Sequence, residues 1–134
     1  MIVDTPPHAE SSGLAAACAA FLIPCRISAF DLRAIGATAE LAKIAGKSAF
    51  ALLNAAPPAA HRLMEQARSA ISAHELRVCP VSVLRRAAFV HAVTVGLSVS
   101  EFEPSGRAAA EISALYRWLI SQLWPRSRER RRAA

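Results

Sequence analysis

Met1-Ile2-Val3-Asp4-Thr5-Pro6-Pro7 begins the sequence with an apolar run, an aspartate and two prolines. A short apolar strand that ends in a carboxylate is typical of open α/β sheets, which bind ligands beyond the carboxyl ends of their strands. Proline cannot continue such a strand, so the chain is expected to turn after Asp4. In nucleotide-hydrolysing domains a carboxylate at this position helps to hold Mg²⁺ against the phosphates. The run therefore predicts a strand over residues 2–4 with Asp4 as the candidate metal and catalytic residue, the alternative being an acid that caps the following helix.

Short apolar runs recur along the chain and alternate with longer stretches of helical period. This alternation is typical of βαβ units, in which parallel strands are joined by helices that cover the sheet. The expected fold is therefore α/β, with a doubly wound, mostly parallel sheet. Strands are expected at residues 2–4, 21–24, 49–54 and 77–80.

The stretches between these strands have apolar residues at intervals of three and four, which predicts one sheet-facing stripe on each helix. The first helix has its stripe at Ala34, Ala37, Leu41 and Ile44; the next has it at Leu63, Met64, Ala67, Ala70 and Ile71. The last helix has its stripe at Ile112, Leu115, Tyr116, Leu119, Ile120 and Leu123. Ser105 is its expected N-cap and Pro125 ends it. Gly36 within the first helix indicates either firm packing or a close approach by another group.

Composition favours one folded domain with a basic end. The 134 residues are 54% apolar and only 19% charged, with a formal net charge of +6. Residues 1–125 are assigned to the domain and residues 126–134 to a basic, disordered tail, because the tail has too few apolar residues to pack on a core. Its arginines favour a polyanionic partner. The cysteines are odd in number and form no CxxC pair, and no apolar stretch is long enough to span a membrane, so a reduced, cytoplasmic protein is expected.

Seven segments in order along the chain resemble the ParA/MinD-type, or deviant Walker, partition ATPases. They are residues 4–8, 22–26, 28–32, 52–55, 86–89, 96–104 and 108–119. No single segment is specific, and the ordered series carries the resemblance. It covers the part of that family from the Walker B strand to the last helix and implies a P-loop NTPase-like sheet without the amino-terminal strand and phosphate loop.

The resemblance implies roles for several residues. Asp4 matches the Mg²⁺ carboxylate and Asn54 the asparagine that contacts adenine, with Pro80 and Val81 on the other side of the base. Without the family, the preferred interpretation of Asn54 is a residue that stops a strand before Pro57 and Pro58. The resemblance also implies that basic residues bind nonspecific DNA through its phosphates: Arg85, Arg86, Arg107, Arg126, Arg128, Arg130, Arg131 and Arg132. For Arg85, Arg86 and Arg107 the alternative is a solvated helix face.

Family membership also implies ATP and Mg²⁺ as cofactors, a nucleotide-dependent homodimer, a ParB-like partner protein and a place on the nucleoid. These cofactors need a phosphate loop of the pattern G-x-x-x-x-G-K-[ST]. Gly46-Lys47-Ser48 is the nearest candidate, but Leu41 stands where the first glycine belongs, and the tripeptide leaves a helix and enters a strand. It is interpreted as a helix C-terminal glycine followed by a solvated lysine.

The sequence therefore predicts a partition ATPase by ancestry that neither binds nor hydrolyses ATP by itself, consistent with a truncated chain. Met1 stands directly at the Walker B strand, so residues 2–4 are expected to be poorly paired. Two alternatives stay open. One is a nucleotide-independent DNA-binding or protein-interaction module, and the other is a subunit that docks on a full-length relative.

Overall fold

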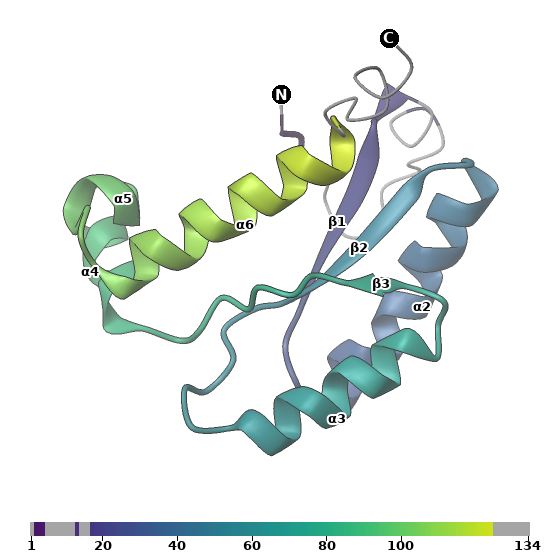
Figure 1. Cartoon of the computed structure of the whole chain (residues 1–134), viewed down its shortest axis with the longest axis horizontal. Helices are drawn as coiled ribbons and strands as arrows, with labels where there is room; N and C mark the ends of the chain where they lie inside the picture. Colours follow the sequence, from purple (N-terminus) through teal and green to yellow (C-terminus); the bar gives the residue numbers. More distant parts are fainter. Residues whose placement is uncertain (1, 5–12, 14–16, 125–134) are drawn as a thin grey trace, which may run out of the picture.

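A small parallel sheet with helices on both faces forms the protein (Figure 1). The computed structural model describes residues 2–4, 13 and 17–124. The elements are β1 (Ala20–Cys25), α2 (Ala29–Ile44), β2 (Ser48–Leu53), α3 (His61–Ser72), β3 (Arg77–Val78), α4 (Ala87–Thr94), α5 (Val99–Phe102) and α6 (Arg107–Leu123). The strands are parallel and lie in the order β1-β2-β3, which confirms the α/β class and the parallel pairing.

β2 is the central strand and separates two apolar layers. Ala51 and Leu53 point to the layer formed with α2 and α3, where Ile35 and Ile71 are buried with them. Leu52 points to the opposite layer, which contains Leu115 of α6 and Cys79. Successive residues of a strand face opposite sides of the sheet, so one apolar strand serves both layers.

The two longer strands lie within one residue of their expected bounds, and the third is shorter than expected. β3 ends at Val78, yet the chain continues beside β2 with single hydrogen bonds, from Cys79 N to Ala51 O at 2.7 Å and from Val83 N to Leu53 O at 2.9 Å. Pro80 lies between these two bonds and has no amide hydrogen to donate to a strand ladder. Of the strand expected at residues 77–80, only the first two residues form a regular strand, and the chain after them is irregular.

The predicted strand over residues 2–4 is wrong. These residues lie outside every strand of the described chain, and Ile2 is 95% exposed. A strand is stable only when neighbouring strands satisfy its backbone groups, and no described strand pairs with this run. The expectation that residues 2–4 would be poorly paired is confirmed.

α2 presents a different face to the sheet from the one the sequence predicts. Ile35 and Ala42 are buried, whereas the predicted stripe is largely outside, with Ile44 77% exposed. Apolar residues occupy both sides of this helix, so their spacing does not distinguish the sheet side from the outer side. Gly36 lies beside His74, and a Cβ at this position would meet Nδ1 of His74 at 3.4 Å, an ordinary van der Waals distance, so no close approach requires a glycine here.

The stripes of α3 and α6 agree better with the structure. Met64, Ala67 and Ile71 of α3 are buried as predicted, while Leu63 and Ala70 are exposed. In α6, five of the six predicted residues are buried or half-buried, and Tyr116 is 61% exposed. The helix begins one residue later than predicted, with Gly106 and not Ser105 as its N-cap, and a Cβ on Gly106 would lie 2.5 Å from the Glu103 carboxylate. α6 ends at Leu123; Pro125 lies outside the described residues.

Candidate functional site

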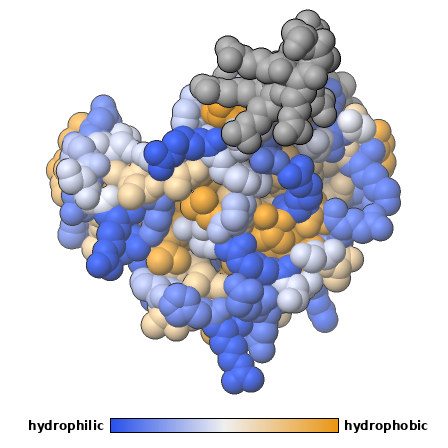
Figure 2. Space-filling model, in the orientation of Figure 1, coloured by the Kyte–Doolittle hydropathy of each residue, from blue (hydrophilic) through white to orange (hydrophobic). Residues whose placement is uncertain are grey.

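An apolar pocket lies where β2 ends, at the carboxyl edge of the sheet. Its volume is about 460 Å³, enough for a purine base. The lining residues come from the end of β2, the segment before α4, α4 itself and α6: Leu52, Asn54, Ala55, Val83, Leu84, Arg85, Arg86, Phe89, Val90, Ile112 and Leu115. Figure 2 shows hydrophobic residues at the surface in the middle of this view, between α6 and α3, with hydrophilic residues around them. Open α/β sheets bind ligands at this edge.

Asn54 stands at the polar end of this pocket. Its backbone N donates to Cys25 O at 2.8 Å, so the residue is fixed where β1 and β2 end. Its Oδ1 accepts from Ala55 N at 3.0 Å, which leaves the amide NH₂ as the group to donate to a ligand. Ala55 has φ 51°, a left-handed conformation that is uncommon for alanine. Backbone strain of this kind is concentrated at binding sites.

Arg86 and Glu111 form the most buried ion pair in the described chain. Glu111 Oε1 accepts from Arg86 Nε at 2.9 Å and also from Nη2, and Oε2 accepts from Leu84 N at 3.0 Å. The side chains are 21% and 15% exposed. The hydrogen bonds that Arg86 donates to the Glu111 carboxylate raise the pKa of Arg86. This pair ties α6 to the segment that forms the pocket wall, so the Arg86 guanidinium is engaged within the protein.

Pro80 and Val81 lie beside this pocket and are not part of its lining. Pro80 is exposed, and Val81 packs in the layer between the sheet and α6. Arg68 of α3 holds their loop, with Nη1 donating to Cys79 O at 2.7 Å and Nη2 donating to Ser82 Oγ at 2.8 Å and to Pro80 O at 3.3 Å. Their contact with a base stays a prediction.

Polar groups also gather after β1, at the same edge of the sheet. Ser28 caps α2 by accepting from Asp31 N at 3.1 Å, and Arg26 Nε donates to Asp31 Oδ2 at 3.1 Å. The Ser28 hydroxyl and then Arg26 hold the pKa of Asp31 below its usual value. This cluster keeps an ionised carboxylate at the start of α2.

Asp4 is exposed and lies in no strand of the described chain, so it does not occupy the end of a sheet strand. Within residues 2–4, 13 and 17–124, no group of three or more His, Cys, Asp or Glu side chains is arranged to hold a metal ion. The described residues therefore do not assemble a Mg²⁺ site around Asp4.

The remaining DNA-binding candidates differ in what the structure says of them. Arg85 and Arg107 are exposed, and neither forms an ion pair with another described residue. The tail arginines from Arg126 to Arg132 lie outside the described residues. Arg85 also lines the pocket, whereas Arg107 does not.

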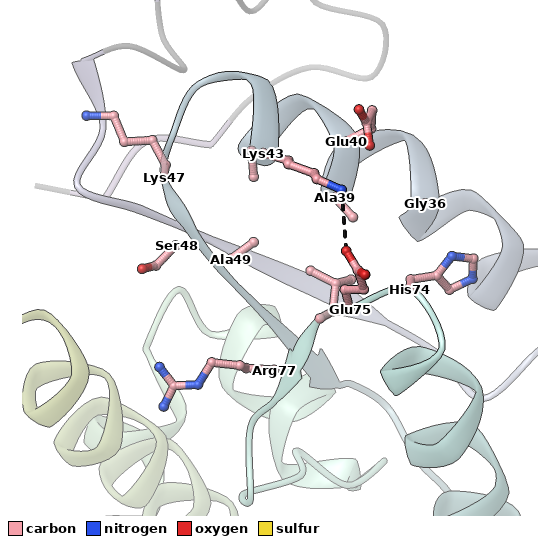
Figure 3. A pocket seen from close by; sticks show the side chains of 12 residues that line it. Gly36, Ala39, Glu40, Lys43, Lys47, Ser48, Ala49, His74, Glu75 and Arg77 are labelled. Atoms are coloured by element: carbon pink, nitrogen blue, oxygen red, sulfur yellow. Dashed lines mark hydrogen bonds and ion pairs between the residues drawn. The ribbon is translucent and has the colours of Figure 1, made fainter.

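Gly46-Lys47-Ser48 is a helix end, as predicted. Gly46 has φ 64° and donates to Lys43 O at 3.0 Å, and Lys47 N donates to Ala42 O at 2.9 Å. These are the two bonds of a Schellman motif. The tripeptide lies at the amino edge of the sheet, next to a cavity of about 410 Å³. Figure 3 shows the Lys47 side chain extending away from the Lys43–Glu75 ion pair that crosses this cavity.

Cys25 and Cys79 are buried thiols beside the sheet. Burial raises the pKa of both, so neither is an activated nucleophile. Both are therefore small residues of the core.

Two residues that organise the site carry no signal in the sequence. Glu111 bonds a residue 25 positions away, and Arg68 bonds a loop 11 to 14 positions away. Neither spacing belongs to a local motif, so only the folded chain identifies them.

No helix within the described ranges is long and apolar enough to cross a membrane.

No family model matches the chain, and no curated protein matches it. The resemblance to partition ATPases rests on the residues quoted above.

Proposed function

We propose that this chain descends from ParA/MinD-type partition ATPases and keeps their adenine-binding pocket and DNA-binding surface without a working phosphate site. The observation that carries the proposal is the apolar pocket at the carboxyl edge, with the Asn54 amide at its polar end. An amide that donates beside apolar walls suits the flat, hydrogen-bonding edge of adenine.

The phosphates are the part of the nucleotide for which this chain has no partners. No G-x-x-x-x-G-K-[ST] pattern occurs in these 134 residues, and Gly46-Lys47-Ser48 lies at the opposite edge of the sheet. Phosphoryl transfer depends on cationic groups and backbone amides placed around the phosphates. The chain by itself is therefore expected to recognise the base weakly and not to hydrolyse ATP.

Adenosine binding tests whether the chain recognises the base without binding the phosphates. At millimolar concentrations adenosine is expected to shift NMR resonances of the pocket residues, including Asn54 and Phe89, and guanosine is expected to shift them less. ATP is expected to bind no more tightly than adenosine, because the sequence contains no phosphate-loop pattern to hold the phosphates. Asn54→Ala should weaken adenosine binding by about tenfold, the effect of losing one well-placed hydrogen bond.

Lys47→Ala is the control for this experiment, since Lys47 belongs to the rejected phosphate motif. Its affinity for adenosine should equal that of the wild type. Three results contradict the proposal: ATP binding much tighter than adenosine, loss of binding in Lys47→Ala, or phosphate release above the buffer rate.

A second candidate function is nucleotide-independent DNA binding, favoured by the exposed Arg85 and Arg107 and by the arginine tail. Binding to random duplex DNA should weaken steeply as salt increases, because each phosphate contact releases counterions. Ending the chain after Trp124 should remove most of the affinity. A plot of log K against log salt has a negative slope. Arg85→Ala and Arg107→Ala should each reduce the magnitude of this slope by about 0.9, the value for one phosphate contact.

Arg62→Ala is the matched control for the DNA experiment, because Arg62 is an exposed arginine on α3. Its salt slope should stay that of the wild type. If the chain binds no DNA at low salt, or if Arg62→Ala changes the slope as much as Arg85→Ala does, the DNA-binding proposal fails. The adenosine experiment is unaffected by this outcome.

A further inference from the structure

The outer side of α2 carries an apolar stripe that the described residues leave uncovered. Phe30 is 88% and Ile44 77% exposed, at opposite ends of the helix. Ala34 and Ala37 are exposed between them, and Leu41 is half-buried. These residues follow one another at intervals of three or four and so lie along one side of the helix. We call Phe30, Ala34, Ala37, Leu41 and Ile44 the outer stripe.

α2 already packs its other side on the sheet. Ile35 and Ala42 are buried there, and Leu32 and Ala39 pack beside them. A helix that is apolar on both sides is typical of a helix between two layers, whereas a surface helix is polar on its outer side. The composition of α2 therefore indicates a second layer over the outer stripe.

The two ends of the outer stripe are placed symmetrically about Ala37. Phe30 lies seven residues before Ala37 and Ile44 lies seven residues after it. If two copies of α2 pack antiparallel around a two-fold axis at Ala37, Phe30 of each copy meets Ile44 of the other. Ala37 then faces Ala37 of the other copy at the centre, where small side chains allow the helices to approach closely, and Ala34 of each copy lies opposite Leu41 of the other. The same apolar residues thus form both sides of the contact, as a two-fold interface requires.

The charged residues beside the outer stripe fit the same arrangement. Arg33 and Glu40 are exposed, lie two turns apart on the same flank, and form no ion pair with another described residue. In the antiparallel pair this flank of one helix faces the same flank of the other. Arg33 of each copy then lies next to Glu40 of its partner, so two opposite-charge contacts border the apolar contact.

We propose that the outer stripe of α2 is the contact surface of a homodimer, with the two α2 helices antiparallel around Ala37. A second copy fits both the size pattern and the placement of opposite charges. This dimer needs no nucleotide, so it differs from the nucleotide-dependent dimer that the family resemblance implies. One 16-residue helix is about 24 Å long. Its face is smaller than the ~800 Å² per partner of a standard interface, so a weak dimer with a Kd of tens of micromolar is expected.

Sedimentation velocity without nucleotide tests the dimer. Between ~1 and ~500 µM the wild type should pass from monomer to dimer, because this range spans the expected Kd. Ala37→Glu puts two like charges on the two-fold axis and should leave the protein monomeric. Ala70→Glu is the matched control, an exposed alanine on α3, and should dimerise like the wild type. Circular dichroism of both variants checks that they fold.

Charge reversal tests the antiparallel register. Arg33→Glu and Glu40→Arg should each weaken the dimer by about tenfold or more, and the double variant should recover the wild-type affinity, because only the paired reversal restores opposite charges across the interface. Ala37→Cys should form an intermolecular disulfide on mild oxidation, whereas Ala70→Cys and the wild type should not.

A wild type that stays monomeric up to ~500 µM overturns the proposal, since other residues or another protein must then cover the stripe. A dimer that Ala37→Glu leaves intact also overturns it, because the contact then lies elsewhere. Failure of the double charge reversal to recover affinity refutes the antiparallel register.

Discussion

Leu53→Ala is expected to lower the free energy of unfolding by about 3 to 4 kcal/mol, the range found when a fully buried leucine leaves a cavity. Leu53 is 0% exposed at the end of the central strand, within the layer between the sheet and the helices α2 and α3. Its neighbours are held by β1, α2 and α3, so they cannot all move to fill the space. Urea denaturation followed by circular dichroism measures the change.

Leu63→Ala makes the same chemical change at a side chain that is 54% exposed on α3. Its effect on the free energy of unfolding should stay within about 0.5 kcal/mol. A protein of this size has only about 5 to 15 kcal/mol of net stability, so the Leu53 variant should lose a large fraction of it. Equal effects of the two substitutions would show that the layer between the sheet and α2 and α3 is loosely packed.

Glu111→Ala is expected to cost about 2 to 3 kcal/mol of stability, because it leaves a largely buried arginine and a backbone amide without their acceptor. Glu111 accepts from both Arg86 and Leu84, and the two side chains of the ion pair are 15% and 21% exposed. The substitution also releases the segment before α4 from α6, so adenosine binding should weaken together with stability. Thermal unfolding and the NMR titration measure the two effects.

Glu65→Ala is the matched control for this ion pair. Glu65 lies 3.7 Å from Arg68 Nε but is 77% exposed, and an exposed pair of this kind contributes less than about 1 kcal/mol. Glu111→Gln keeps an acceptor oxygen and should fall between the alanine variant and the wild type. If Glu111→Ala is no more destabilising than Glu65→Ala, the Arg86–Glu111 pair does not organise the pocket wall.

Local sequence signals predicted the parts of the fold that depend on near neighbours. The apolar runs predicted β1 and β2 within a residue, and β2, the central strand, is continuously apolar because both of its faces are buried. Gly46 after α2 predicted the helix end, since glycine adopts a positive φ without a steric cost. Asn54 lines the pocket at the end of β2, as expected of a polar residue that ends an apolar strand in a parallel sheet, and its contact with a base stays a prediction.

The sequence did not predict features that depend on distant partners. The strand over residues 2–4 failed because strand pairing needs a neighbour that local residues do not reveal. Arg86 was interpreted as a DNA contact, and its pairing with Glu111 across 25 residues is invisible to local spacing. The sheet-facing side of α2 was assigned to the wrong stripe, because the helix is apolar on both sides.

The sequence by itself determined the α/β class, the position of the central strand, the helix end at Gly46 and the place of Asn54, since each follows from the residue's own conformational preference or burial. Only the tertiary structure decided which side of α2 faces the sheet, which arginine is engaged in an ion pair and which residues enclose the pocket. These features depend on the free energy of contacts between residues far apart in the chain, which exist only after the layers have packed. The outer stripe of α2 is the clearest example, because the sequence predicted that it faces the sheet and the structure places it on the opposite side of the helix.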